Sequence, residues 1–204
     1  MCIRDSLRPV LLVLALAAIA LPLVGSFSTW VTLTFAGLAM GMIIFIVASG
    51  MTLVFGLMDV LNFGHGLFIA IGAYMAATVL GSMADWTQSG SLWLNLAAVL
   101  PALIVGMLVA GAVGVAFERV IVRPVYGQHL KQILITMGGM IIGEEIIKML
   151  WGPQTLSLPL PDALRGAVLV GDAAIEKFRI VALVVGLGVS VSYTHLTLPT
   201  NREV

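Results

Sequence analysis

A short stretch of polar residues and glycines interrupts the most apolar part of this sequence. Residues 29–55 and 67–83 contain no charged side chain. Between them lie the groups that could do chemistry: Asp59, Asn62, Gly64, His65 and Gly66. An ionisable group facing lipid costs at least about 2.5 kcal/mol, so such groups normally face a cavity, a bundle interior or the membrane surface. The stretch is therefore either a functional break or a polar turn at the membrane surface.

Each residue type in this stretch suits a different task. Asn62 is a good N-cap, and the helix it starts would carry partial positive charge on its free N–H groups. Gly64 and Gly66 would let another backbone or a substrate come close, or would only serve helix packing. Asp59 and His65 could form a titrating pair if a broken helix brought them together, since a six-residue spacing puts them on different helical faces.

Motifs for other chemistry are missing from the sequence. It contains no GxxxxGK[ST] phosphate loop, no His/Cys spacing for a metal and no Ser/His/Asp set on a plausible scaffold. We therefore predict no catalytic residue, no metal site and no cofactor in this chain. Net charge is zero and no basic run occurs, so nucleic acid is not predicted as a partner.

Composition indicates the membrane class. The chain is 60% hydrophobic and 10% charged, with a mean hydropathy of +1.12, whereas soluble proteins average about 25% charged residues. We predict an all-α integral membrane protein with about five complete transmembrane helices plus a truncated sixth. The predicted segments are residues 9–24, 29–55, 62–83, 92–117 and 132–150, followed by the short run 180–189. The first segment is a span or a cleaved signal sequence.

The two ends are expected to be foreign to the fold. Residues 1–6 and 191–204 resemble translated sequencing-adapter read-through, which leaves residues 7–190 as a transmembrane domain that is expected to be incomplete at its C-terminus. Cys2 and His195 then carry no function.

The orientation follows from the positive charges. Glu118, Arg119, Arg123 and Lys131 lie between two apolar segments, and the positive-inside rule places this loop in the cytoplasm. Residues 85–91 and the long loop 152–179 are then outside. All four tryptophans fall at the outer boundary in this orientation: Trp30, Trp86, Trp93 and Trp151. Near that end, Glu144 and Lys148 are four residues apart and are expected to pair.

Two blocks resemble a known family. The run from Ala48 to Gly66, continuing to Tyr74, and the block with Glu118, Arg119, Arg123-Pro124, residues 134–138 and Trp151-Gly152-Pro153 are similar to the membrane permeases of branched-chain amino acid ABC importers, the LivH-type family. The similarity covers roughly residues 30 to 160. Urea and amide permeases share much of the pattern, so the substrate is less certain than the family.

The resemblance implies a permease subunit in the bacterial plasma (inner) membrane that forms part of the translocation pathway. It implies a second permease, cytoplasmic ATPase subunits that bind ATP, a periplasmic or extracellular substrate-binding protein and surrounding lipid as partners. The break at Asp59–Gly66 would lie beside the passage, and the helix start at Asn62 would favour the carboxylate of a passing amino acid. The alternative is a proton-coupled secondary transporter or channel that uses Asp59 and His65.

Overall fold

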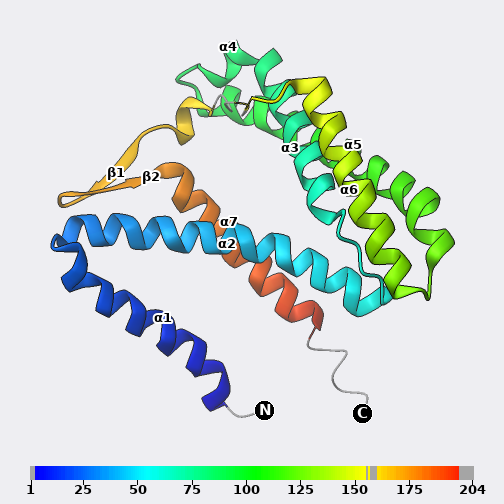
Figure 1. The fold of residues 1–204 in the computed structure, drawn as a ribbon. Helices are drawn as coiled ribbons and strands as arrows, with labels where there is room; N and C mark the ends of the chain where they lie inside the picture. The colour runs from blue at the N-terminus through cyan, green and yellow to red at the C-terminus, as the bar shows by residue number, and fades with distance from the viewer. Residues whose placement is uncertain (1–2, 155, 157–159, 198–204) are drawn as a thin grey trace. The chain divides into compact units, whose positions relative to one another are not determined.

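The computed structural model describes residues 3–154, 156 and 160–197. Residues 1–2 and 198–204 of the two predicted foreign ends lie outside this range. The described chain is mostly helical, as its composition predicts, and Figure 1 shows its elements in order. It divides into two compact units, Met1–Ile46 with Arg165–Val204, and Val47–Leu164. The long helix α2 (Phe27–Met58) contributes residues to both.

The first unit contains α1 (Ile3–Val24), the start of α2, and α7 (Lys177–Thr197). Gly25, at a φ of 71°, makes the tight turn between α1 and α2. The indole N–H of Trp30 donates to the carbonyl of Ala17 across this turn, at 2.7 Å. Gly186 of α7 packs against Met42, since a Cβ at Gly186 would lie 2.5 Å from the Met42 Cβ.

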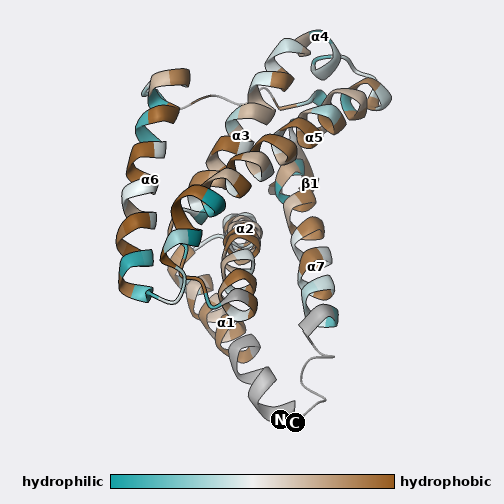
Figure 2. Ribbon diagram, turned by 90° about the vertical axis from the view of Figure 1, so that its right-hand side faces the viewer, coloured by the Kyte–Doolittle hydropathy of each residue, from teal (hydrophilic) through white to brown (hydrophobic). Residues whose placement is uncertain are grey.

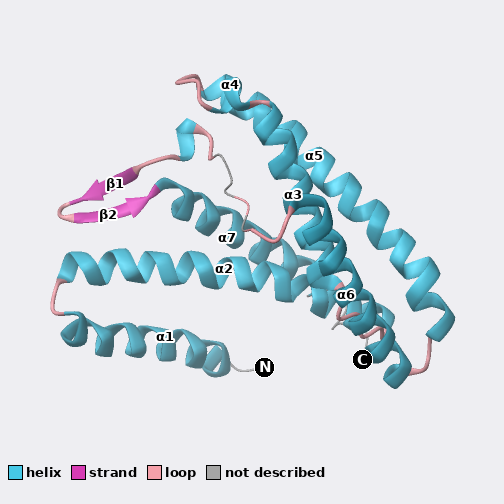
Figure 3. Ribbon diagram, turned by 45° about the horizontal axis from the view of Figure 1, so that its top comes forward, coloured by secondary structure: helices cyan, strands magenta, loops and turns pink. Residues whose placement is uncertain are grey.

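A small antiparallel hairpin precedes α7. Its strands are β1 (Ala167–Val170) and β2 (Ala173–Glu176), and Figure 3 shows them in magenta. The sequence predicts a loop over residues 152–179, and the hairpin corrects that prediction in part. β-branched and small residues around the Gly171-Asp172 turn, where Gly171 has a φ of 61°, favour a hairpin there. Pro159 of that predicted loop lies outside the described residues.

The second unit is a group of helices around α3 (His65–Ser82) and α5 (Leu92–Phe117), which run side by side (Figures 1 and 3). They cross at glycines, because a Cβ at Gly106 would lie 2.7 Å from the carbonyl oxygen of Gly72. α6 (His129–Trp151) packs against α3, where Leu67 fills the space that a side chain at Gly143 would need. The shorter elements of this unit are α4 (Ala84–Thr87), the π-helix η1 (Glu118–Val122), and the 3-10 helices η2 (Arg123–Val125) and η3 (Asp162–Leu164).

Among the described residues, four helices are long and apolar enough to cross a membrane: Phe27–Leu57, His65–Ser82, Leu92–Val125 and Lys177–His195. Leu11–Val24 is a shorter apolar helix. α6 is long, but Glu144, Glu145 and Lys148 lie near its end, and Figure 2 shows hydrophilic colour at both of its ends. The fold class is thus an all-α membrane protein, as predicted.

Two helices are longer than their apolar runs. α2 continues as one helix through Gly37, Gly41 and Gly50, from Phe27 to Met58. α7 runs well past the apolar run 180–189, to Thr197. Two hydroxyl groups in this part bond within the helix: Ser192 donates to the carbonyl of Gly188 at 2.9 Å, and Thr194 donates to the carbonyl of Val191 at 2.8 Å.

One end of the second unit collects three of the tryptophans. Trp86 lies in α4 and Trp93 at the start of α5, and the Trp151 indole at the end of α6 donates to the Thr78 hydroxyl at 2.9 Å. Asn95 holds this end together, donating to the carbonyl of Ser89 at 2.8 Å and accepting from the N–H of Ala163 at 3.1 Å. The sequence predicts all four tryptophans at the outer boundary; three of them share this end of the second unit, and the side of the membrane on which they lie stays a prediction.

The charged pair near that end is not the one predicted. Lys148 donates to Glu145 at 2.6 Å, three residues earlier, and not to Glu144. Both the i,i+3 and the i,i+4 neighbour are within reach on a helix, so the spacing alone could not choose between them.

Candidate functional site

The polar stretch is a true interruption of helical structure. α2 ends at Met58, and α3 begins at His65. The N–H of Asp59 still donates to the carbonyl of Phe55 at 2.9 Å, while Asp59 itself adopts a φ of 53°. Aspartate tolerates this left-handed conformation better than most residues, so it can end a helix and redirect the chain. We call residues 59–64 the break.

Contrary to the prediction, Asn62 is not the N-cap of α3. The helix begins three residues later, with Gly64 in the N-cap position. The Asn62 side-chain oxygen accepts from the N–H of Gly64 at 2.9 Å, and its backbone carbonyl accepts from the N–H of His65 at 3.3 Å. Asn62 therefore forms a turn before the helix. The N–H groups of Gly64 and His65 therefore already have partners. Two fewer free N–H donors remain at this helix start for the carboxylate that the sequence predicted it would attract.

The two glycines have different surroundings. Gly64 is buried against the ring of Phe117, whose Cζ would lie 3.2 Å from a Cβ at this position. Nothing lies within 4 Å of the corresponding point at Gly66, which is exposed. The close approach predicted for both glycines therefore occurs at Gly64 alone, and an aromatic side chain makes it.

Phe117 connects the break with the other helices. Its ring packs edge-on against Phe68 with centroids 5.2 Å apart, and it also lies against Gly139 of α6, where a Cβ would be 2.6 Å away. Phe117 forms a buried cluster with Val60 and Val122. The ring thus sits in a socket with Gly64 on one side and Gly139 on the other.

Asp59 pairs with His129, a residue that no sequence motif marks. Its carboxylate lies 3.8 Å from Nε2 of His129, at the start of α6, and both side chains are more than half exposed. A pair that long and exposed contributes little to stability. His65 instead lies beside Gly50 of α2, where a Cβ would be 3.0 Å from its Nε2. Within the described residues, Asp59 and His65 form no ion pair or hydrogen bond with each other, although the proton-coupled alternative depends on such a contact.

The predicted cytoplasmic loop is a compact turn. Glu118 and Arg119 lie in η1, Arg123 begins η2, and Lys131 lies in the first turn of α6. The hydroxyl of Tyr126 donates to the Glu118 carboxylate at 2.6 Å, and this bond raises the pKa of Tyr126. The three basic side chains are exposed. The single acid of the loop is therefore used inside the turn, which leaves the positive charges facing outward.

Two polar residues of α6 are fully buried beside the break. Thr136 accepts from the backbone N–H of Phe63 at 3.3 Å, and the amide N–H of Gln132 donates to the carbonyl of Val125 at 3.2 Å. Their exposed fractions are 0% and 1%. The signal in the sequence was two polar residues four apart in an apolar helix, which places them on one face.

A small cavity lies beside the break. It has a volume of about 140 Å³ and is mostly apolar. Its wall is formed by the end of α2, the break and the start of α3: Met51, Val54, Phe55, Val60, Leu61, Asn62, His65 and Phe68. Asn62 and His65 are the polar members of this wall. Asp59 is not part of it.

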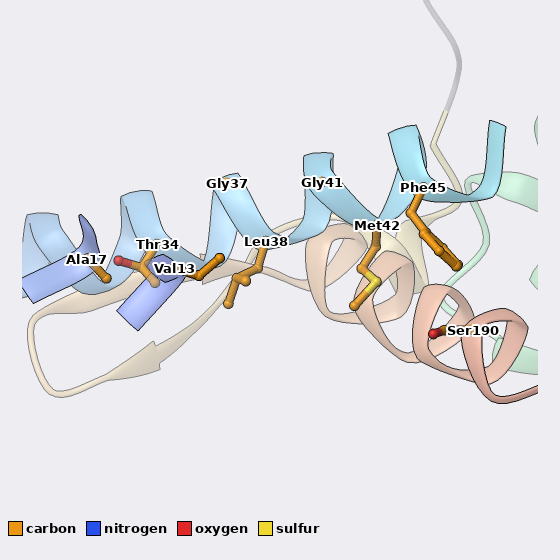
Figure 4. A pocket seen from close by; sticks show the side chains of 9 residues that line it. All are labelled: Val13, Ala17, Thr34, Gly37, Leu38, Gly41, Met42, Phe45 and Ser190. Carbon is orange, nitrogen blue, oxygen red and sulfur yellow. The ribbon is translucent and has the colours of Figure 1, made fainter. Parts of the chain in front are cut away.

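A second, larger groove lies in the other unit. It has a volume of about 540 Å³ and is lined by residues of α1, α2 and α7. Figure 4 shows Leu38, Met42 and Phe45 projecting from α2 with Ser190 of α7 nearby. Gly37 and Gly41 border it, and no atom lies within 4 Å of the point that a Cβ would occupy at either glycine, so no other helix among the described residues packs closely there. No group of His, Cys, Asp and Glu side chains suited to a metal ion occurs in the part of the chain that the structure describes.

Comparison with known proteins agrees with the resemblance. Residues 33–159 match the family model described as branched-chain amino acid transport system / permease component. The high-affinity branched-chain amino acid transport system permease protein LivH of Salmonella typhimurium is 29% identical over 140 residues, which cover 68% of this chain and 44% of that protein. LivH of Escherichia coli is 32% identical over 127 residues, covering 61% and 40%.

The corresponding permease BraD of Pseudomonas aeruginosa is 28% identical over 162 residues, covering 79% of this chain and 48% of that protein. The chain thus spans less than half the length of the curated relatives it matches. No solved structure gives a significant match. Because the family model covers more than half of the sequence, the chain belongs to the family of permease components of branched-chain amino acid transport systems.

Proposed function

We propose that this chain forms part of the translocation pathway of an ABC importer for branched-chain amino acids, and that the break lies beside the passage. The observation that carries the proposal is the 140 Å³ cavity next to the break. It is bounded by aliphatic and aromatic side chains, with an amide and an imidazole at its wall. Small-molecule sites are typically lined in this way, by apolar residues with a few placed polar groups.

The size of the cavity suits an aliphatic side chain. A water molecule occupies about 30 Å³, so the cavity has room for roughly four or five groups of that size. That is enough for the branched part of leucine, isoleucine or valine. Urea and small amides could hydrogen-bond to Asn62 and His65, but their remaining polar atoms would lie against apolar side chains such as Val54 and Phe55, which offer no hydrogen bond. The cavity therefore favours the branched-chain substrate over the polar ones.

The same proposal assigns the other components. A permease component is not an enzyme, and we propose that the energy comes from ATP bound by separate cytoplasmic ATPase subunits, since the sequence contains no phosphate loop. A second permease would complete the pathway, and an external substrate-binding protein would deliver the amino acid. The protein is a multi-pass component of the bacterial plasma (inner) membrane, surrounded by lipid.

The test uses the complete permease, reconstituted in liposomes with its ATPase subunits, second permease and binding protein. Val54→Phe places a ring in the cavity, while Val115→Phe makes the same change at an exposed site on α5, outside the cavity wall. Overpacking and steric exclusion of about 1–3 kcal/mol correspond to roughly a 5- to 150-fold loss. We expect a loss of that order for leucine, a smaller loss for alanine, and little change in the Val115→Phe control.

Two results would count against the proposal. Equal losses for leucine and alanine in Val54→Phe would show that the cavity does not contact the side chain of the substrate. Uptake of urea, with none of leucine, in the unmodified complex would place the protein among the polar-substrate permeases.

A further inference from the structure

The break and the turn between α5 and α6 are both attached to the same short part of one helix. Gln132 and Thr136 lie one turn apart on one face of α6, and both side chains are fully buried. The Thr136 hydroxyl accepts from Phe63 N–H in the break at 3.3 Å and donates to the backbone carbonyl of Gln132 at 2.7 Å. It thus uses its donor and its acceptor at once.

Gln132 makes the matching attachment to the turn. Its amide N–H donates to the carbonyl of Val125 at 3.2 Å, at the end of η2. The turn needs such a tie, because its backbone leaves the regular α-helical ladder after Phe117, first for a π-helix and then for a 3-10 helix. These forms have poorer hydrogen-bond geometry and often occur at hinges or functional sites.

The oxygen of the Gln132 side-chain amide indicates that a glutamine is needed here for its bond to the Val125 carbonyl. Its oxygen Oε1 is buried without a hydrogen-bond partner among the described residues. An unpaired buried acceptor destabilises a fold, so an apolar side chain of similar size would pack here at less cost. The amide is explained by what its N–H group holds, which is the Val125 carbonyl.

We propose that Gln132 and Thr136 are positioning residues that join the turn 123–128 and the break to the start of α6, so that the two segments move together. The link itself rests on the contacts above. We infer that the link serves transport: when a cytoplasmic subunit displaces the turn 123–128, the link carries that displacement to the break. This role rests on the proposed function. Phe117 supports the same link from the other side, since its ring is held between Gly64 and Gly139.

Hydrogen–deuterium exchange on the complete permease in nanodiscs tests the link without measuring transport. Thr136→Val removes the hydroxyl at nearly constant shape, and Thr136→Ser retains it. Loss of one hydrogen bond of ordinary net strength corresponds to roughly a two- to tenfold change. We expect exchange in residues 60–66 to rise by that factor in Thr136→Val and to return close to the original rate in Thr136→Ser.

The control is Thr52→Val in α2. The Thr52 hydroxyl also donates to a carbonyl one turn earlier, that of Ala48 at 2.9 Å, but it is exposed. We expect this variant to leave exchange in residues 60–66 unchanged. An equal rise in Thr52→Val would show that the effect comes from removing a helical hydroxyl, and the proposal would be wrong.

Gln132→Leu tests whether the turn and the break are coupled or are each held independently by α6. Gln132→Met is a second variant of similar volume. If the segments move together, either variant raises exchange in the break as well as in the turn, although Gln132 is bonded only to the turn by its side chain. A rise confined to residues 123–128 in both variants would overturn the proposal. The proposed function has its own test. If the unmodified complex takes up no branched-chain amino acid while the exchange results are as expected, the proposed function is wrong and the link between the turn and the break still holds.

Discussion

Gly64→Ala is expected to destabilise the protein and Gly66→Ala is not, although the two glycines are only two positions apart. A methyl group at Gly64 would lie 3.1 Å from the side-chain oxygen of Asn62 and 3.2 Å from the Phe117 ring. The ring has little room to withdraw, because Gly139 lies on its other side, where a Cβ would be only 2.6 Å away. Nothing stands within 4 Å of the corresponding point at Gly66.

The magnitudes follow from this geometry. Overpacking costs about 1–3 kcal/mol, and the reduced freedom of the unfolded alanine chain returns about 0.4–1 kcal/mol, since the φ of −71° at Gly64 suits alanine. The two ranges combine to a net loss of about 0–2.6 kcal/mol, and about 1–2 kcal/mol is expected for Gly64→Ala because Asn62 and Phe117 both crowd the added methyl group. Gly66 lies in the first turn of α3, so alanine there should be neutral or stabilising by up to about 1 kcal/mol.

The assay is unfolding of the purified permease in nanodiscs, with each variant also made in a Phe117→Leu background. Replacing the planar ring should relieve the crowding, so the cost of Gly64→Ala should fall by about 1 kcal/mol there while that of Gly66→Ala does not change. Equal costs for both alanines, or the same Gly64→Ala cost with and without Phe117, would refute the proposed socket.

Three further predictions concern charges and topology. Cysteines placed at Gln128 and Ser89 should label from opposite sides of the membrane in intact cells, Ser89 from outside, and labelling of Gln128 from outside would reverse the predicted orientation. Asp59→Asn should change uptake and stability little, because its pair with His129 is 3.8 Å long and exposed; loss of uptake would instead favour the proton-coupled alternative. Glu118→Gln should lower the pKa of Tyr126 toward its usual value, because the bond to the ionised carboxylate holds the phenol proton; ultraviolet titration checks this, with Tyr126→Phe to identify the signal and an unchanged pKa as the contrary result.

The sequence was informative wherever one local property decides the structure. Long uncharged runs predicted α2, α3 and α5, and the cluster of Asp59, Asn62 and glycines marked the place where the helices stop. The exact start of α3 was missed by three residues, because Asn62 can hydrogen-bond to nearby backbone in a turn as well as at an N-cap.

Contacts between distant residues could not be predicted in this way. Nothing in the glycine pattern shows that Phe117, some fifty positions later, would pack on Gly64, or that His129 would face Asp59. These pairings depend on how α3, α5 and α6 pack, and that packing is fixed by tertiary contacts. The charged loop was located correctly as a connection, but Gln132 and Thr136, beside it in the sequence, were read only as the start of an apolar helix.

Photo-crosslinking with a diazirine analogue of leucine tests the central claim most directly, namely that an aliphatic substrate passes the cavity beside the break. The complete importer would be illuminated during ATP-driven uptake, and the labelled peptides identified by mass spectrometry. We expect label within residues 51–55 and 60–68, which form the cavity wall, with suppression by excess isoleucine and not by urea. Label confined to other parts of the chain, such as the groove between α2 and α7, with none in those two segments, would contradict the claim.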